Sequence, residues 1–409
     1  MKPDTTLSLF PAACSRRSVL LTIAGAAAQL AGCGGGGTGV AGLSSGGTGS
    51  FTSGTITGFG SIIVNGIRYD DSSAALLPIN STANASLLQL GMVVTIEGSI
   101  VTPAASAGAL PTATATRIRF GSEWEGPVGN ITTTSFDILG HTVDVLTSTI
   151  FSGNNGTSPV TKISDLNTNC YAEVYGYVNQ TNGRLQASRI DVTTTQPTEY
   201  KLSGTITSIT GNTALLGATS ITWSPSYALP TGVTSGSFVR VILNNTSTAS
   251  AGTATRIELV DSLLGDLSST QDYEAEIHGT ITAYTSNTSF SVNGIPVNAT
   301  TAQITGTLAA GVTVEVTGSI RAGQLIATQI EVETSTQIAS QTFEFYGQIS
   351  NLNTSTHTFV LRGLSFSYDT TNTILNGVNF ALNSAPMVKV KAIQNANGQL
   401  FATEIDLQT

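Results

Sequence analysis

Residues Gly311–Val332 read GVTVEVTGSIRAGQLIATQIEV, with apolar and polar side chains alternating on both sides of a turn at Gly323. Alternation with a period of two residues is typical of a strand that has one buried and one exposed face. The second half of the segment ends in ATQIEV, in which Ile330 and Val332 share a face. The segment therefore predicts two short β-strands joined by a turn.

The ATQIEV motif that closes this segment is repeated. Its pattern is a small residue, Thr or Ser, a polar residue, Ile, a polar residue and an apolar residue. Five copies occur, beginning at Ala115, Ala187, Ala254, Ala327 and Ala402, and they are 72, 67, 73 and 75 residues apart. Self-similarity at a nearly fixed period is the sequence signature of a repeat architecture. We therefore predict five copies of one module.

Each copy contains other short strand-like runs before its closing motif. The copies open with Gly-x-(Ile/Val) at Gly54, Gly126, Gly204, Gly279 and Gly347. An apolar run then reaches a second Gly, and Asn-Gly between two such runs, as in IIVNG at residues 62–66, is a strong hairpin signal. No window after residue 50 shows the 3.6-residue period of a helix, so each copy is predicted to form five strands.

These elements predict an all-β fold, a tandem array of about five small five-stranded OB-like β-barrel modules. Closing a sheet into a barrel removes the edges along which strands aggregate. The recurrent Gly residues permit the bends and bulges of barrel corners. A small open sandwich is the alternative fold for a module of this length.

The repeat spacing also predicts the boundaries. We assign a signal peptide to residues 1–32, a Gly/Ser-rich tether to 33–50, and modules 1 to 5 to residues 51–122, 123–199, 200–269, 270–339 and 340–409. A module of this size buries only a modest core, so neighbouring modules are expected to pack together. Aromatic residues near the module starts are expected to fill the junctions: Trp124, Tyr200, Tyr273 and Phe345.

The first residues have the pattern of an export signal. Arg16 and Arg17 precede an apolar stretch at Val19–Ala31, which is shorter than the ~20 residues of a membrane span. The stretch ends in LAGC, which resembles a lipobox and predicts cleavage between Gly32 and Cys33 with lipidation of Cys33. An ordinary signal peptide is the alternative. The Arg pair also resembles a twin-arginine motif, so either that pathway or general secretion could serve for export.

Composition excludes several classes of protein. Charged residues make up 10% of the chain and the net charge is -9, so no basic face is available to bind nucleic acid. Recurrent apolar β-formers argue against disorder, and a single apolar run argues against a multi-span membrane protein. Cys170 is the one Cys outside the signal, so we expect no disulfide within the modules and a buried, inert thiol.

Candidate catalytic residues are scattered. His141, His278 and His357 lie in different modules at non-equivalent positions and are expected to be turn or surface residues. Three carboxylate pairs have the i, i+2 spacing that places both side chains on one face of a strand. Paired carboxylates can perform acid–base chemistry in a cleft, but solvated strand faces are the expected role here: Glu123/Glu125, Glu274/Glu276 and Glu331/Glu333.

One further pair is a candidate for ion binding. Asp70 and Asp71 follow Tyr69 at the end of a predicted strand, and they are weak candidates for a cation site. No other metal-ligand pattern is present, and we expect no catalytic residues and no cofactor.

The repeat resembles a module of bacterial lipoproteins that is known only as a domain of unknown function. The resemblance lies in the Gly-x-Ile opening, the Asn-Gly hairpin, the Gly-x-x-Val strand and the closing Ala-Thr-x-Ile. It covers residues 51–408 and is clearest in modules 1 and 4, whereas modules 2, 3 and 5 lack individual Gly residues. It implies no catalytic residues.

These observations favour a non-enzymatic envelope lipoprotein, a spacer or binding array for a protein or envelope polymer. The residue after Cys33 is Gly34 rather than Asp, which favours the outer membrane, on its periplasmic or cell-surface side. The expected partners are the membrane, through the N-terminal lipid, and an envelope protein or glycan. A carbohydrate-binding array is the alternative, with Trp124 and Trp223 as the available aromatic platforms, and an envelope hydrolase is less favoured.

Overall fold

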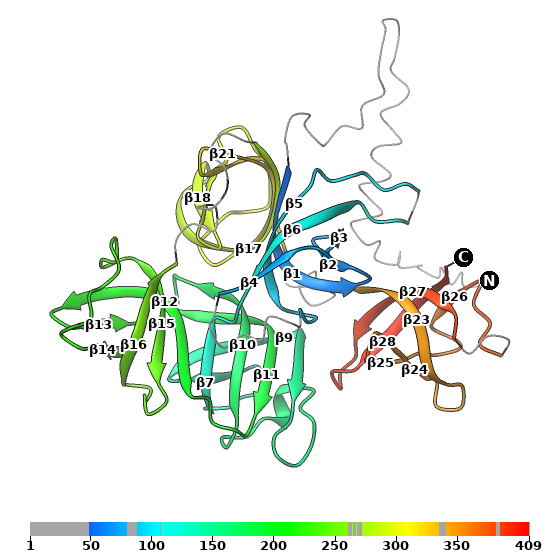
Figure 1. Cartoon of the computed structure of the whole chain (residues 1–409), viewed down its shortest axis with the longest axis horizontal. Coiled ribbons are helices and arrows are strands. Elements are labelled where there is room, and N and C mark those ends of the chain that lie inside the picture. Colours follow the sequence, from blue (N-terminus) through cyan, green and yellow to red (C-terminus); the bar gives the residue numbers. More distant parts are fainter. Residues whose placement is uncertain are drawn as a thin grey trace, which may run out of the picture. The chain divides into compact units, whose positions relative to one another are not determined.

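The computed structural model describes residues 49–79, 88–106, 108–260, 264, 267, 272–334, 341–381 and 385–408. Arg16, Arg17, Gly32 and Cys33 lie outside these residues. The described part forms strands β1 to β28 and one short 3-10 helix, η2 (Ile163–Asp165), which confirms the all-β prediction (Figure 1). Among these residues, no helix has the length and apolar character needed to span a membrane.

Module 1 is a closed barrel of five strands. These are β1 (Gly49–Phe59), β2 (Ile62–Val64), β3 (Ile67–Asp70), β5 (Val93–Gly98) and β6 (Thr112–Phe120). The strand order is β1-β2-β3-β6-β5 and back to β1, with the β3–β6 pair parallel and the other pairs antiparallel. A register shift between Ile56 and Gly58 lets β1 pair first with β5 and then with β2. This order, in which the third strand meets the fifth, is that of an OB-type barrel.

The other four modules repeat this topology. Module 2 contains β7 (Trp124–Gly129), β8 (Ser135–Ile138), β9 (His141–Gly153), β10 (Tyr171–Asn179) and β11 (Arg184–Thr193). Module 3 contains β12 (Glu199–Thr210), β13 (Thr213–Leu216), β14 (Thr219–Thr222), β15 (Phe238–Asn244) and β16 (Ala251–Leu259). Module 4 contains β17 (Tyr273–Ser286), β18 (Ser289–Val292), β19 (Ile295–Asn298), β21 (Thr313–Arg321) and β22 (Gln324–Val332). Module 5 contains β23 (Phe343–Asn353), β24 (Thr358–Leu361), β25 (Leu364–Ser367), β27 (Met387–Gln394) and β28 (Leu400–Leu407).

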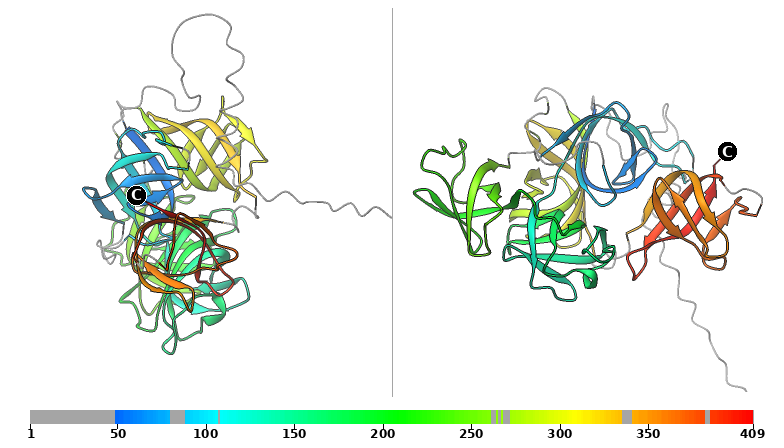
Figure 2. Two further views of the ribbon diagram at one scale, coloured as in Figure 1. Left: turned by 90° about the vertical axis from the view of Figure 1, so that its right-hand side faces the viewer. Right: turned by 60° about the horizontal axis from the view of Figure 1, so that its bottom comes forward.

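Every module closes on itself through the same five pairings. The curled strands are visible in the blue and orange-to-red modules of Figure 2. The open sandwich is therefore not the fold. Strand β1 begins at Gly49, so the last two residues assigned to the tether already belong to module 1.

A sixth strand in several modules did not follow from the sequence. Strands β4 (Ala75–Pro78), β20 (Gln303–Thr305) and β26 (Ile374–Asn376) each pair in parallel with the closing strand of their own module. They contain three or four residues that are exposed or half-buried, and they are too short to show the apolar alternation that marks the other strands.

In modules 1 and 4 the opening Gly has a steric explanation. In modules 1 and 4 the hairpin Asn adopts a positive φ, +49° at Asn65 and +52° at Asn293, and its side chain turns back onto the opening strand. Asn65 Nδ2 donates to the Ser53 carbonyl at 3.1 Å. A Cβ added at Gly54 would lie 2.1 Å from Asn65 Oδ1, a distance that side chains do not tolerate. The opening Gly is therefore required by the hairpin Asn, whose side chain occupies the space that a Cβ would need.

The expected junction aromatics are confirmed except for one. Trp124 is buried and donates from Nε1 to the Ser203 carbonyl of module 3 at 2.8 Å, and Tyr200 stacks on Tyr171 of module 2. Tyr273 lies against the backbone of Gly49. Phe345 instead packs in the core of its own module, with its ring 4.9 Å from that of Phe366. The residues around Trp124 and Tyr200 form a single apolar cluster that runs from module 2 into module 3.

Candidate functional site

The Asp pair is an exposed turn. Asp70 ends β3, and its Oδ1 accepts a hydrogen bond from the Ser72 backbone N–H at 3.1 Å, which lowers the pKa of Asp70. This local bond is the usual Asx-turn arrangement. Within the described ranges, no group of three or more His, Cys, Asp or Glu side chains is placed to hold a metal ion, so Asp70 and Asp71 remain a pair without further ligands.

The three His residues have separate local roles, and the expectation of turn or surface positions is wrong for two of them, since His141 begins β9 and His278 lies within β17, both half-buried. His141 Nε2 lies 2.9 Å from Thr219 Oγ1, and His278 Nε2 lies 3.0 Å from Glu333 Oε2. His357 sits in a turn at φ +53°, with its ring 5.2 Å from that of Tyr368. Cys170 is buried, as expected from its solitary position.

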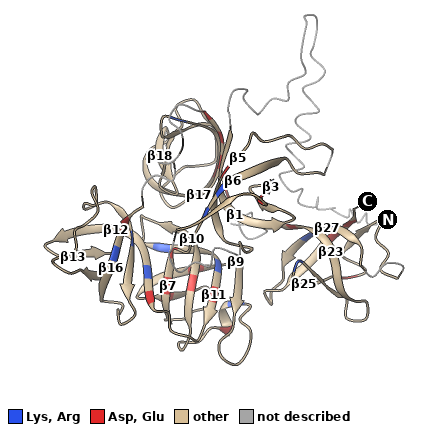
Figure 3. Ribbon diagram, in the orientation of Figure 1, with Lys and Arg blue, Asp and Glu red and all other residues tan. Residues whose placement is uncertain are grey.

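The structure brings one predicted carboxylate into a larger group. Glu125 lies directly opposite Glu173 in the β7–β10 pair, and Glu173 lies opposite Asp191 in the β10–β11 pair. Asp191 in turn lies opposite Ser152 on β9. Directly opposed residues in a sheet project on the same face. Three neighbouring strands therefore carry a row of three carboxylates on the outer face of module 2, which we call the acidic row (Figure 3).

A buried cation balances one end of the acidic row. Lys201 of β12 lies opposite Glu125, and its Nζ is 3.5 Å from Glu125 Oε2 and 3.6 Å from Glu173 Oε1. Ser122 Oγ lies 2.5 Å from the same Nζ and donates to Glu173 Oε1 at 2.7 Å. The Lys201 side chain is only 3% exposed, so this ion pair is shielded from solvent and from salt.

Arg189 balances the other end. Its guanidinium donates from Nε to Asp191 Oδ2 at 3.0 Å and from Nη1 to the Leu90 carbonyl at 2.9 Å, and it also bonds the Gln89 side chain. Arg189 therefore links the acidic row to the segment that precedes β5. Three carboxylates face two cations, so directly opposed like charges, which destabilise a bare sheet, are largely offset.

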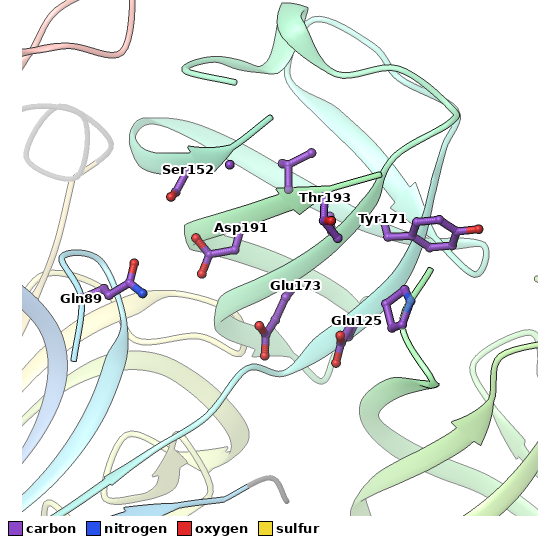
Figure 4. Close-up of a pocket in the computed structure, with 11 residues that line it drawn as sticks. Gln89, Glu125, Ser152, Tyr171, Glu173, Asp191 and Thr193 are labelled. Carbon is purple, nitrogen blue, oxygen red and sulfur yellow. The ribbon is translucent and has the colours of Figure 1, made fainter. Parts of the chain in front are cut away.

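The acidic row lines a cavity of about 340 Å³ (Figure 4). Its other walls come from Gln89, Tyr171 and Pro197, among other residues. Burial raises the pKa of Glu125, although Lys201 opposes this effect, and burial also raises the pKa of Asp191 against the pull of Arg189. The cavity therefore presents half-buried carboxyl groups that can accept hydrogen bonds from a cationic or hydroxylated group.

Sequence reasoning identified Glu125 but missed Glu173, Asp191 and Lys201. A signal was present, since Glu125 directly precedes an opening Gly and Asp191 directly follows the Ile of a closing motif. The same two positions meet the fourth strand in every module, as Ser203 and Glu258 do across Arg240 in module 3. The remaining carboxylate pairs do not line the cavity.

Three segments of the chain match a known protein family. Residues 125–191, 278–331 and 346–406 match the family described as Domain of unknown function (DUF5666). Three separate segments of the chain are therefore similar to this domain. Each DUF5666 match begins at the residue before an opening Gly and ends at the polar residue after a motif Ile. These are the positions that Glu125 and Asp191 hold in the acidic row of module 2. The matches include module 4, and they include modules 2 and 5 rather than module 1, where the motifs are more complete.

Other comparisons give less. No curated protein matches the chain. Among solved structures, the chain described as "drosophila Unr CSD456" is similar over 52% of this chain and 98% of that chain, with 13% identity and a TM-score of 0.14.

Proposed function

We infer that the protein is a non-enzymatic envelope lipoprotein, lipidated at Cys33, whose five DUF5666-type barrels serve as a spacer and binding array. The junction between modules 2 and 3 gives this proposal its main support. A single apolar cluster spans both barrels, and Trp124 and Lys201 cross between them. A junction of this kind resists bending far more than a Gly/Ser linker does, which suits an array that presents surfaces at a distance from a membrane.

The binding surface that this proposal uses is the outer face of the barrels. The acidic row and its cavity suit a partner with amino or guanidinium groups, as in a basic protein segment or an amino sugar of an envelope polymer. The carbohydrate-array alternative has less support, because Trp124 and Trp223 are 1% and 7% exposed and neither provides an open platform for a sugar ring.

Lipidation is tested by metabolic labelling with a radioactive fatty acid in a Gram-negative host. The wild-type chain should take up label and fractionate with the outer membrane, whereas Cys33→Ala should lose the label and remain unprocessed or soluble. Cys170→Ala is the matched control and should be labelled like wild type. Equal labelling of the Cys33→Ala chain would contradict the anchor.

The binding role is tested by crosslinking on intact cells followed by mass spectrometry, which identifies the partner and the exposed leaflet together. We expect crosslinks between a barrel face and one envelope component. The non-enzymatic role is tested with purified full-length protein and isolated envelope polymers. Turnover of any of these polymers would overturn it.

A further inference from the structure

The closing strand of a module normally carries a short parallel segment on its outer edge. In modules 1, 4 and 5 this segment is β4, β20 or β26, and in module 2 it is the second half of β9. In all four modules the segment spans the Ile of the closing motif. The residue opposite that Ile is always large and apolar: Leu76, Phe151, Ile304 or Leu375.

Module 3 departs from this rule. Within the described part of the chain, β16 pairs with β15 on one side, and on the other side only its first residues, Ala251–Thr253, pair with β14. Among the described residues no strand lies opposite Ile257, the motif Ile of this module. The edge that a parallel strand covers in modules 1, 2, 4 and 5 is therefore without such a strand in the described part of module 3.

A tyrosine hydroxyl occupies the vacant place. Tyr227 OH accepts a hydrogen bond from the Ile257 N–H at 2.8 Å and donates one to the Ile257 carbonyl at 3.1 Å. One side chain thus satisfies the two backbone groups that a parallel strand bonds elsewhere. A buried backbone group without a partner is costly, so the hydroxyl keeps the free edge tolerable.

Few hydrogen bonds hold Tyr227 in place, although its half-buried ring also packs against the apolar cluster that modules 2 and 3 share. It belongs to the irregular segment 223–237 between β14 and β15, where the backbone bond of Tyr227 itself is made to Ser224 at 2.8 Å. That bond is internal to the segment. Rotation of the Tyr227 side chain away from β16 would break only its two bonds to Ile257 among the hydrogen bonds described.

We propose that the outer edge of β16 in module 3 is a docking site for an extended peptide of a partner protein, which adds in parallel as the sixth strand and displaces Tyr227. The in-chain occupants define its chemistry, a run of three or four residues with Leu, Ile or Phe opposite the motif Ile. Strand addition of this kind draws affinity from backbone hydrogen bonds and specificity from alternate side chains. A docked strand would continue toward Leu259, as β4 continues to the equivalent residue Phe120.

This inference rests on the binding role in the proposed function and specifies a partner for it. It does not depend on lipidation or on the acidic row. A failed peptide experiment would therefore leave the anchor and spacer roles untouched, and a soluble, unlipidated chain would leave the docking site untouched.

The test uses a fluorescent peptide that copies residues 300–306 of this chain, which contain β20, and the purified full-length protein. Binding is followed by fluorescence anisotropy, and its position by hydrogen exchange in the segment that contains Ile257. We expect the peptide to slow exchange in residues 254–259. The same peptide with Asp in place of its single Ile, which copies Ile304, should not bind.

The matched variants are Tyr227→Phe and Tyr284→Phe. Tyr227→Phe removes the competing hydroxyl and should tighten peptide binding about fivefold to tenfold, from the loss of one or two hydrogen bonds that the peptide must replace. Tyr284 bonds only the side chain of Asn287 among the partners described, so Tyr284→Phe should bind like wild type. Exchange in β15 confirms that the variants remain folded. Three results would overturn the proposal. The first is equal affinity of wild type and Tyr227→Phe for the peptide. The others are absence of binding to both at 1 mM peptide (about 4 kcal/mol of binding free energy) and protection from exchange outside β16.

Discussion

At the scale of single residues, the repeat is held by a contact between two positions that are far apart in the motif. Asn293 accepts a hydrogen bond from the Thr280 N–H and donates one to the His278 carbonyl, and its amide fills the space where a side chain at Gly279 would lie. In module 5 the equivalent position is Arg362, which also has a positive φ and also donates to the carbonyl before the opening Gly, that of Tyr346. The chemistry of the position is preserved although the residue differs.

The Gly279→Ala variant should destabilise module 4. The new Cβ would lie 2.0 Å from Asn293 Nδ2, so the hairpin must move and lose its bonds to the opening strand. Overpacking of this kind costs about 1–3 kcal/mol. Denaturant-dependent hydrogen exchange in β17 and β18 measures the loss. Gly129→Ala is the control, since only the Asp137 carbonyl, at 3.9 Å, lies near its added Cβ, and an equal loss in both variants would refute the explanation.

The Arg362→Asn variant should stabilise module 5. A left-handed backbone is unfavourable for Arg and readily adopted by Asn, and Asn at this position makes the required carbonyl contact in modules 1 and 4. We expect a gain of about 0.5–1 kcal/mol from relief of this strain. Exchange in β23 and β24 reports it. Arg362→Lys keeps the charge but not the conformational preference and should give no gain; stabilisation by Lys would instead point to an effect unrelated to φ.

At the scale of strands, the pairing register generates the candidate site. The alternation and Gly positions of the sequence predicted the barrel strands because each strand buries every second side chain. They did not predict β4, β20 and β26, whose structure depends on the edge they cover rather than on their own pattern. Glu125 was identifiable by its spacing to Glu123, but its meeting with Glu173 and Asp191 depends on register across three strands, which no local pattern contains.

The acidic row should give modules 2 and 3 a characteristic pH dependence. Burial raises the folded-state pKa of Glu125 above its ordinary value of 4.5, so the folded state binds this proton more tightly than the unfolded state does. By linkage, the contribution of Glu125 to stability is fully present below the unfolded pKa and is lost as the pH rises through the folded pKa.

Glu125→Gln should therefore flatten this part of the pH profile, measured between pH 4 and 8 by thermal unfolding or by exchange in β7 and β12. Asp144→Asn is the control, because the Asp144–Arg184 pair is more than a third exposed on both sides and contributes little to stability. If the Glu125→Gln and wild-type profiles have the same slope over this range, Glu125 does not titrate as the burial argument requires.

At the scale of the whole molecule, modules 2 and 3 should behave as one cooperative unit. Trp124→Ala removes a buried indole and its hydrogen bond to Ser203 from the shared cluster. A large-to-small change of this kind costs about 3–5 kcal/mol. Limited proteolysis of the full chain should then cut both modules at similar rates. Phe290→Ala, in the separate core of module 4, should leave modules 2 and 3 resistant, and cleavage of module 2 alone in Trp124→Ala would show that the two barrels unfold separately.

The parallel pairing of β1 with β17 bears on the order in which the chain can fold. Gly49–Ser53 opens module 1 but lies in register with Tyr273–Ile277, which opens module 4. During synthesis or export from the N-terminus, the first strand would emerge long before its partner. Parallel pairs between segments so distant in sequence form slowly. Until module 4 emerges, the edge of β1 that pairs with β17 has unsatisfied backbone groups and can aggregate. A chaperone that binds extended strands would protect this edge while the chain is incomplete.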